Sequence, residues 1–378
     1  MPTLDIYHIR NNPELYAETC LLRNYPNLAS NPFRITKLMF YHQALQEAVK
    51  SLRERANALE NELLVLKEEG RNIEESLKEV REIKLKILEV EEVKVDIMSK
   101  IEDLALALPN ITSKETPRGL NWDYICSVNA DEKIIQIKDR KRKPIHHVDI
   151  GKQLGIIEFA SAANASGSGW CYLVGAGATG TGPRLLRSLL HDSRRLDSPQ
   201  ASSGEQQVYN IAQDEKDKTR GVPGLSLTGT SGIALAGMVA NKIISEEELP
   251  LRRVAASRCY RPDTGLDTEG LYNVNEFTNV ELFAWTKPDE EEMEYFFDEI
   301  IDIQTDILGA LGITCRVLDM PVHYLRAREA RRVAIKAFFP FRAVGKTPDE
   351  VHDAAWGEIA SSHQHTKQAA SPANCTPD

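Results

Sequence analysis

The chain contains 378 residues, of which 42% are hydrophobic and 27% are charged, and its formal net charge is −10. That length is enough for two or three domains that each bury a core. The acidic balance disfavours a general nucleic-acid coat but permits a local basic patch.

The sequence offers no sign of membrane insertion or export. Its apolar runs are shorter than a membrane span, and its first residues lack both a signal-peptide core and the pattern of a mitochondrial presequence. We therefore expect a cytoplasmic protein without a membrane partner. The six cysteines are scattered without a CxxC pair, which is typical of ordinary thiols rather than of disulfides or a zinc site.

Two long helices are predicted near the start of the chain. The first spans residues 37–69, and the second spans residues 72–108 and ends before Pro109. Apolar residues in both alternate at spacings of four and three, with one shifted heptad early in the second, as in the seam of a coiled coil. The seam residues are Leu45, Val49, Leu52, Ala56, Leu59, Leu63, Leu66, Ile83, Ile87, Val90, Lys94, Ile97, Ile101, Leu104 and Leu108. Gly70 separates two runs of matched length, which favours an antiparallel hairpin within one chain over a coiled coil between two chains.

Basic residues cluster near the predicted tip of this hairpin. They are Lys67, Arg71, Lys78 and Arg81. Contacts with nucleic-acid phosphates are one interpretation of this cluster. A solvated face of mixed charge is the alternative, because Glu and Lys alternate along both helices.

The middle of the chain gives weaker signals. Residues 110–150 are expected to form a linker that leads into short strands, and the basic run at 138–147 is interpreted as a charged loop. The glycine-rich run at 175–182 matches neither a phosphate-binding loop nor a dinucleotide fingerprint. Residues 196–221 are polar and are predicted to form a surface loop.

Two strands are predicted on either side of a polar loop between residues 257 and 285. Side chains of the second strand alternate between two faces. Its odd-numbered face carries an aromatic ring, a carboxylate and three amides: Asn273, Asn275, Phe277, Asn279 and Glu281. Because a half-buried strand normally hides one face, this polar face is a candidate ligand site.

A helix over residues 288–311 and a strand over residues 313–320 are predicted next, with acidic residues in the first turn of the helix. The expected inward face of the helix is Met293, Phe296, Phe297, Ile300, Ile303, Ile307 and Leu311. The chain loses apolar content after Trp356. His363 and His365 are interpreted there as a solvated pair rather than as metal ligands.

Several segments resemble the seryl-tRNA synthetases, particularly the fungal mitochondrial type. They occur in the family's order, at residues 4–26, 146–178, 229–238, 257–265 and 270–288. The resemblance implies an α+β fold in three parts. An N-terminal antiparallel coiled-coil hairpin domain (1–110) is followed by a class II synthetase-like antiparallel sheet flanked by helices (111–360), expected to be incomplete, and by a disordered tail (361–378).

The resemblance also implies the family's reaction. Serine and ATP condense to seryl-adenylate with Mg²⁺, and the seryl group then passes to serine tRNA, whose long variable arm the hairpin would contact. Members of the family are homodimers, although the motif that forms their dimer interface is not evident in this sequence. A mitochondrial location is compatible with the resemblance.

Matching motifs assign roles to residues near the polar strand face. Arg261 would hold the α-phosphate and the serine carboxylate as the catalytic residue, and Asp263 stands for the glutamate of the family's Arg-x-Glu. Phe277 would stack on adenine, and Val274 would contact the nucleotide. Glu281 would bind the serine amine.

Three further residues are assigned in the same way. Thr230 would complete the serine site together with Arg261 and Glu281. Glu358 and Ser361 match the positions that bind ATP and Mg²⁺.

The same motifs show departures from the family pattern. Gly232 stands where the serine-binding Thr-x-Glu has its carboxylate, and Asn273, Asn275 and Asn279 stand where the family has arginine, histidine and lysine. The arginine that would clamp the γ-phosphate has no counterpart. Because residues that act as a unit abolish function when lost, these departures predict weak or absent seryl-adenylate formation.

Four interpretations remain open on the sequence alone. The chain could be a working synthetase with an unusual site, or a non-catalytic paralogue that binds tRNA or protein. It could be an accessory or resistance protein of a specialised metabolic gene cluster. An incorrectly spliced gene model would also explain the truncated motifs.

Overall fold

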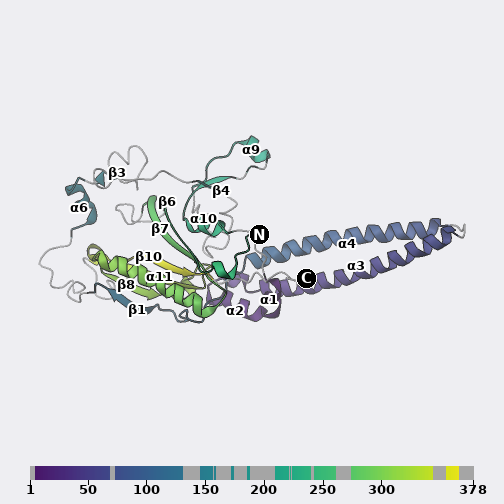
Figure 1. Cartoon of the computed structure of the whole chain (residues 1–378), viewed down its shortest axis with the longest axis horizontal. Coiled ribbons are helices and arrows are strands. Elements are labelled where there is room, and N and C mark those ends of the chain that lie inside the picture. The colour runs from purple at the N-terminus through teal and green to yellow at the C-terminus, as the bar shows by residue number, and fades with distance from the viewer. Residues whose placement is uncertain are drawn as a thin grey trace. The chain divides into compact units, whose positions relative to one another are not determined.

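A computed structural model describes two compact units, Thr3–Thr112 and Ser113–His365 (Figure 1). The described residues are 5–68, 73–130, 145–155, 157–158, 172–173, 185–187, 209–220, 222, 224–239, 242–260, 274–343 and 355–365. The first unit is helical and the second combines helices with antiparallel strands, so the chain has the α+β fold that the sequence predicts.

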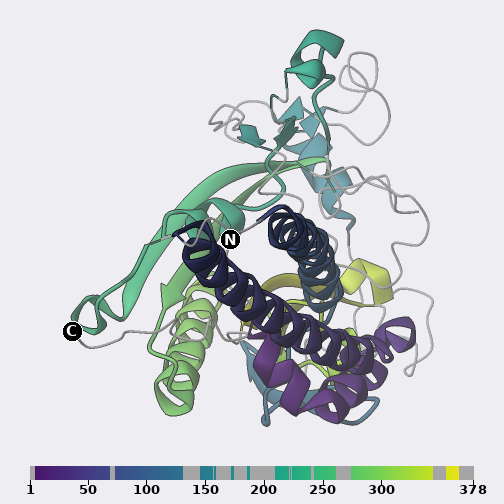
Figure 2. The ribbon, with the colours of Figure 1, turned by 90° about the vertical axis from the view of Figure 1, so that its right-hand side faces the viewer.

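The first unit consists of short helices followed by a long helical hairpin. Its elements are α1 (Ile6–Asn11), α2 (Pro13–Leu22), the 3-10 helix η1 (Pro26–Leu28), α3 (Asn31–Glu68) and α4 (Glu74–Leu106). Asp5 begins α1 as an N-cap, because its carboxylate accepts a hydrogen bond of 2.9 Å from the backbone N–H of His8. The long helices α3 and α4 lie alongside each other (Figure 2).

The seam between α3 and α4 lies within one chain. Ala56 and Leu59 of α3 form a buried cluster with Val80 and Ile83 of α4. The predicted intrachain hairpin is therefore confirmed. Lys94 also occupies the seam, where its ammonium group lies 2.9 Å from the carboxylate of Glu91.

Ion pairs join the exposed flanks of the two helices. Arg53 pairs with Glu91 at 3.1 Å, Arg55 with Glu79 at 3.2 Å, and Lys84 with Glu60 at 2.7 Å. Each pair contributes little to stability at such exposed positions. The apolar seam therefore holds the hairpin together.

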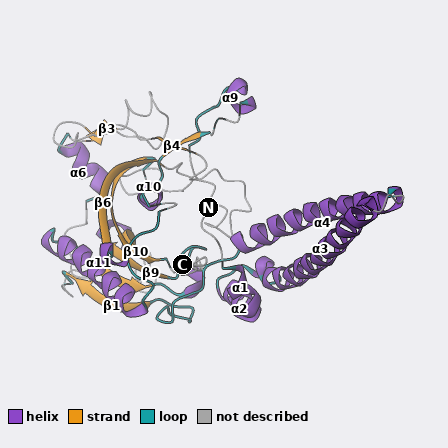
Figure 3. Cartoon of the chain, turned by 45° about the vertical axis from the view of Figure 1, so that its right-hand side comes forward, coloured by secondary structure: helices purple, strands orange, loops and turns teal. Residues whose placement is uncertain are grey.

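A four-stranded antiparallel sheet with the order β1-β8-β9-β10 forms the centre of the second unit. Its strands are β1 (Asp123–Val128), β8 (Cys315–Asp319), β9 (Arg331–Phe338) and β10 (Trp356–Gln364). Helix α11 (Glu290–Ala310) packs along one face of this sheet (Figure 3). Phe297 and Ile301 of α11 are buried there against Val317 of β8 and Ile335 of β9.

The inward face of α11 agrees with the prediction at Phe296 and Phe297, which are buried, and differs from it towards the end of the helix. Ile303, Ile307 and Leu311 are exposed, whereas Ile301 and Leu308 are buried against the sheet. The reason is that the helix carries two apolar stripes, and polar contacts select between them. Gln304 of α11 accepts a hydrogen bond of 3.1 Å from the Ser362 hydroxyl of β10, on the sheet side. Glu294, also on that side, accepts one of 3.2 Å from the Gln364 amide.

A network of ion pairs joins α11 to strands β8 and β9. The Arg331 guanidinium lies 2.8 Å from the carboxylate of Asp319 and 2.5 Å from that of Glu294. The side chains of Arg331 and Asp319 are both mostly buried. Removing either partner would therefore leave the other as an unpaired buried charge, which strongly destabilises a fold.

Further strands pair two by two. Long strands β6 (Leu251–Tyr260) and β7 (Glu276–Trp285) form one antiparallel ribbon, as the sequence predicts for residues 257–285. The shorter pairs are β2 (Ile157–Glu158) with β3 (Tyr172–Leu173), and β4 (Leu185–Arg187) with β5 (Leu225–Leu227). The remaining helical elements are α6 (His147–Gln153), α9 (Glu215–Thr219), α10 (Gly232–Gly237), η5 (Glu246–Glu248), η6 (Val322–Tyr324) and η7 (Pro340–Ala343).

Two expectations for loops need correction. Residues 215–219 form α9 inside the segment predicted to be a surface loop. Residues 361–364 belong to β10, although the sequence assigns them to a disordered tail. Their ladder with β9 supplies backbone hydrogen bonds that composition alone does not reveal. The glycine-rich run at 175–182 and residues 138–144 of the basic run lie outside the described residues.

Candidate active site

The β6–β7 ribbon presents a polar face that is protected from solvent. Along β7 the odd-numbered side chains are partly buried, whereas Thr278, Val280 and Leu282 between them are exposed. The pairing places Ser257 of β6 opposite Asn279, and both side chains belong to the protected face. The alternation predicted from the sequence is confirmed along β7.

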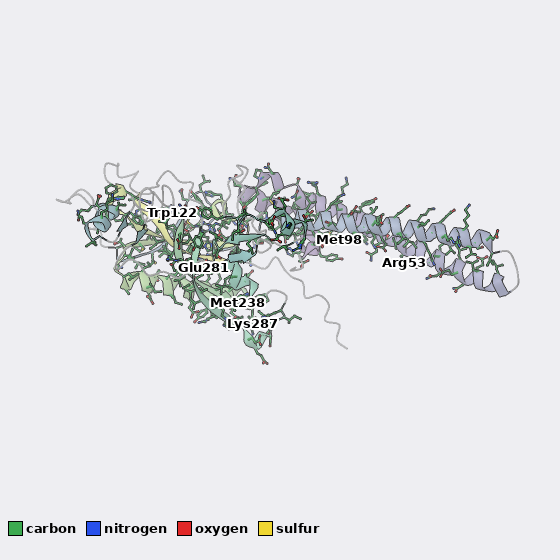
Figure 4. The ribbon with its side chains drawn as sticks, turned by 90° about the horizontal axis from the view of Figure 1, so that it is seen from above. Arg53, Met98, Trp122, Met238, Glu281 and Lys287 are labelled. Atoms are coloured by element: carbon green, nitrogen blue, oxygen red, sulfur yellow. The ribbon has the colours of Figure 1, made fainter. Side chains whose placement is uncertain are left out.

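Glu281, which is labelled in Figure 4, lies at the centre of a hydrogen-bonded cluster on this face. One carboxylate oxygen accepts from the Thr230 hydroxyl and, at 2.8 Å, from the Asn279 amide. The other oxygen accepts from the Ser231 hydroxyl. A carboxylate supported by three uncharged donors can hold an ammonium group without a counter-cation from the protein.

Gly232 leaves space beside this carboxylate. It opens α10, and its backbone N–H donates to the Thr230 hydroxyl at 3.1 Å. A Cβ atom added there would meet the Thr230 hydroxyl at 3.4 Å and a Glu281 carboxylate oxygen at 3.6 Å, which are ordinary contacts. The position therefore has room for a Cβ atom, and the sequence supplies no side chain there.

A buried thiol borders the same face. Cys259 of β6 is fully buried opposite Phe277, and its sulfur lies 3.5 Å from the Ser257 hydroxyl. Burial raises the pKa of the Cys259 thiol, and the charge of Glu281 adds to this rise, while the hydrogen bond with Ser257 opposes it. The thiol therefore remains protonated at neutral pH.

A second group of polar side chains lies on the β9–β10 sheet. One nitrogen of the Arg332 guanidinium contacts both carboxylate oxygens of Glu358, at 2.6 and 2.8 Å. The Ser361 hydroxyl lies 2.9 Å from Nε2 of His363. These side chains alternate with Val333, Ile335 and Ser362, which face α11, and so they lie on the opposite face of the sheet.

Glu329 supports His363 from below this face. It is fully buried, and its carboxylate lies 2.9 Å from Nδ1 of His363, in ion-pair range but without hydrogen-bond alignment. Burial alone would raise the pKa of Glu329, but the contact with His363, the backbone N–H of Arg326 and the charge of Arg332 outweigh it and lower the pKa to about 2. The interpretation of His363 and His365 as a solvated pair is therefore wrong for His363.

The structure brings together some of the predicted site residues. Thr230 and Glu281 are in direct contact, and Phe277 shares the face of β7 with Glu281. Val274 precedes β7. Arg261 and Asp263 lie outside the described residues.

Glu358 and Ser361 both project from β10, where a bulge between residues 358 and 360 puts them on one face. The hairpin candidates Lys78 and Arg81 are exposed one turn apart on α4, and Lys67 lies in α3. Arg71 lies outside the described residues.

Sequence reasoning missed two kinds of residue. It named Asn279 as a loss, although its amide supports Glu281. It passed over Ser231 and Glu329, because each acts on a partner that is distant in sequence. The sequence gives one signal for Ser231, which is its hydroxyl group inside the serine-binding motif between Thr230 and Gly232.

Neither a membrane-spanning helix nor a metal-binding group occurs among the described residues. No helix among them is both long and apolar enough to cross a membrane. Within the same ranges, no three His, Cys, Asp or Glu side chains converge as they would around a metal ion.

Family models match both units of the chain. The seryl-tRNA synthetase N-terminal domain matches residues 3–112, and the tRNA synthetase class II core domain (G, H, P, S and T) matches residues 215–353. The two matches lie in the order that the sequence resemblance implies.

Individual relatives agree with these models. The mitochondrial serine–tRNA ligase of Mus musculus is 32% identical over 288 residues, which cover 69% of this chain and 52% of that protein. The serine–tRNA ligase of Rubrobacter xylanophilus is 29% identical over 368 residues, and the match covers 90% of this chain and 80% of that protein. This chain thus spans about half of the mouse relative. Its relatives include bacterial and mitochondrial proteins.

A solved structure shares the fold over nearly the whole chain. The crystal structure of seryl-tRNA synthetase from Pyrococcus horikoshii complexed with ATP superposes with a TM-score of 0.79 at 25% identity. The match covers 97% of this chain and 85% of that one.

Proposed function

Because the chain belongs to the seryl-tRNA synthetase family, we propose that it binds serine and the adenine of ATP on the protected β6–β7 face and forms seryl-adenylate weakly or not at all. The hydrogen-bonded cluster around Glu281 carries this proposal. It keeps a carboxylate ready for the serine ammonium group, but Gly232 contributes no second carboxylate beside it.

The side chains of the cluster divide the work of binding. Glu281 would hold the serine amine, and Thr230 would orient that carboxylate through its hydroxyl. Phe277, on the same strand face, would stack on adenine. Arg261, by its motif, would contact the α-phosphate and the serine carboxylate, and Asp263 would take the place of the motif's glutamate at the ATP site. A substrate held by fewer polar groups is positioned less firmly, which lowers the rate of the chemical step.

The residues matched to a magnesium site do not fit that ion as they stand. Both carboxylate oxygens of Glu358 are engaged by Arg332, and the Ser361 hydroxyl is engaged by His363. Mg²⁺ is bound in proteins by carboxylate oxygens together with water and phosphate. A neighbouring guanidinium would repel it. No step of the proposed function is therefore assigned to protein-held Mg²⁺.

Serine- and ATP-dependent pyrophosphate exchange tests the proposal. Purified chain should show exchange far below that of the Rubrobacter xylanophilus ligase measured beside it, while isothermal titration should still detect serine. A Glu281→Gln variant should lose serine binding, because it removes the charge that attracts the ammonium group. Exchange at the rate of the reference enzyme would refute the impaired-catalysis part, and absence of serine binding by folded protein would refute the site.

A second function, tRNA binding without catalysis, is supported by the exposed Lys78 and Arg81 on α4. If these residues contact the phosphates of serine tRNA, the affinity falls with salt, and each lost contact lowers the salt slope by roughly one. The double variant Lys78→Ala/Arg81→Ala should therefore bind serine tRNA more weakly. Lys100→Ala, near the other end of α4, is the matched control. Equal affinities of both variants for serine tRNA would show that the hairpin tip does not contact the tRNA.

Homodimer formation is a further proposal from the family. One chain has a mass of 42.4 kDa, and a homodimer should show twice that mass in size-exclusion chromatography with light scattering. A monomer at micromolar concentration would refute it.

A further inference from the structure

A row of charges crosses three adjacent strands on the sheet face opposite α11. The register places Arg316 of β8 beside Lys336 of β9, and Lys336 beside Glu358 of β10. Arg332, two residues before Ala334 on the same face of β9, completes the group through its contact with Glu358. We name these four residues, Arg316, Arg332, Lys336 and Glu358, the sheet-face charge cluster.

The cluster has an excess of positive charge. Glu358 is the one carboxylate that β8, β9 and β10 present on this face, and the buried Glu329 adds a second negative charge near Arg332, against three cationic side chains. Glu358 is already paired with Arg332. Lys336 is half-buried, and no carboxylate of the described residues lies in ion-pair range of its ammonium group.

This arrangement favours an anion over a divalent cation. A magnesium ion here would have to displace Arg332 from Glu358 and would then stand beside Lys336. A phosphate group meets the opposite situation, because a guanidinium and an ammonium group both donate to its oxygens. The Arg332–Glu358 pair would hold the guanidinium in place, so that little side-chain entropy is lost when an anion arrives.

We propose that the sheet-face charge cluster binds the polyphosphate of a nucleoside triphosphate directly, through Lys336 and Arg332, without a protein-held divalent cation. The inference rests on the proposed function for the identity of the nucleotide, and on the cluster itself for the class of ligand. Arg316 lies with its guanidinium 4.1 Å from the ring centroid of Trp356, at the end of the cluster. That contact fixes the third cation at the edge of the anion site.

Titration calorimetry on the full chain tests this inference. ATP and inorganic tripolyphosphate are each titrated in EDTA and in MgCl₂, and the two conditions should give affinities within about threefold of each other. Lys336→Glu places a second carboxylate beside Glu358 and should weaken binding in EDTA by tenfold or more. Lys242→Ala, at an exposed lysine between α10 and η5, is the control and should change nothing.

Glu358→Gln separates the two kinds of site. In an anion site the substitution releases Arg332 and removes a repelling charge, so it should tighten tripolyphosphate binding in EDTA. In a magnesium site it removes a metal ligand, so it should weaken ATP binding in MgCl₂. Far-UV circular dichroism confirms that each variant is folded, and tighter binding by Glu358→Gln cannot arise from unfolding.

The outcomes distinguish this inference from the proposed function. ATP binding that is tenfold weaker in EDTA overturns the inference and leaves the proposed function standing. Tripolyphosphate binding in EDTA without ATP binding would show an anion site that does not accept a nucleotide, and it overturns both the inference and the ATP part of the proposed function. ATP binding in EDTA that Lys336→Glu leaves unchanged overturns the inference alone. Failure of folded protein to bind either ligand in both conditions refutes the two together.

Discussion

The side-chain amide of Asn279 donates a hydrogen bond of 2.8 Å to Glu281, its neighbour but one on the same face of β7. An amide can donate to the carboxylate without neutralising its charge. Asn279 therefore keeps the Glu281 carboxylate oriented.

Replacing Asn279 by leucine tests this support. The variant should lose about 1 kcal/mol of stability, the usual value of one hydrogen bond, and should bind serine more weakly because Glu281 is less firmly oriented. Urea denaturation and titration calorimetry measure the two effects. Val280→Thr, on the exposed face of the same strand, is the control, and equal losses in both variants would contradict the assignment.

Ser231→Ala tests whether the chain competes with its ligand. The Ser231 hydroxyl occupies a carboxylate oxygen of Glu281 that an ammonium group would also use. Its removal should tighten serine binding severalfold, because the ligand no longer has to displace the hydrogen bond from Ser231 to Glu281. Titration with serine measures the change. Ser245→Ala, at the N-cap of η5, should leave serine affinity unaltered. Weaker binding by Ser231→Ala would instead make this hydroxyl part of the serine site.

Stability should fall in acid through Glu329. Its pKa is lowered from 4.5 to about 2 in the folded chain, so its stabilisation is complete above pH 4.5 and is lost as the pH falls from 4.5 towards 2. The shift corresponds to on the order of 3 kcal/mol. The difference in unfolding free energy between the parent chain and Glu329→Gln should therefore shrink across that pH window. A difference that stays constant from pH 6 to pH 3 would show that the pKa of Glu329 is the same in the folded and the unfolded chain, which would refute the lowered value.

Arg331→Met should destabilise the sheet unit by about 3–5 kcal/mol, because it leaves the buried carboxylate of Asp319 without its partner. Urea denaturation followed by tryptophan fluorescence measures this, since Trp122, Trp285 and Trp356 all lie in that unit. Arg253→Met, at an exposed position of β6, is the control. A loss below 1 kcal/mol would mean that water replaces the guanidinium at Asp319.

The hairpin could be predicted in detail because its information is local. Heptad spacing in residues 37–108 is sufficient to define both helices and their seam, and Val80, Ile83 and Ile97 are buried there. The face of α11 could not be predicted in the same way. Two apolar stripes compete on that helix, and polar partners on β10 decide between them. Those partners lie far along the chain, so no local pattern reveals them.

In the candidate site, too, local patterns predict some residues, whereas others depend on partners far along the chain. Strand alternation identifies the face that carries Phe277 and Glu281, because a strand has a period of two. The contacts of Ser231 with Glu281, and of His363 with Glu329, depend on how separate elements meet. The bulge in β10 adds a further shift of register, which places Ser361 and Glu358 on one face.

The pairing of β1 with β8 has a consequence for synthesis of the protein. Residues 123–128 leave the ribosome long before residues 315–319, their only strand partner in the described sheet. The hairpin of α3 and α4 needs no such wait, because its apolar seam is formed by residues that are close in sequence and already made. During translation, the chain should therefore carry a finished helical hairpin and an unpaired β1 strand, whose exposed edge is the segment that a ribosome-bound chaperone would be expected to cover.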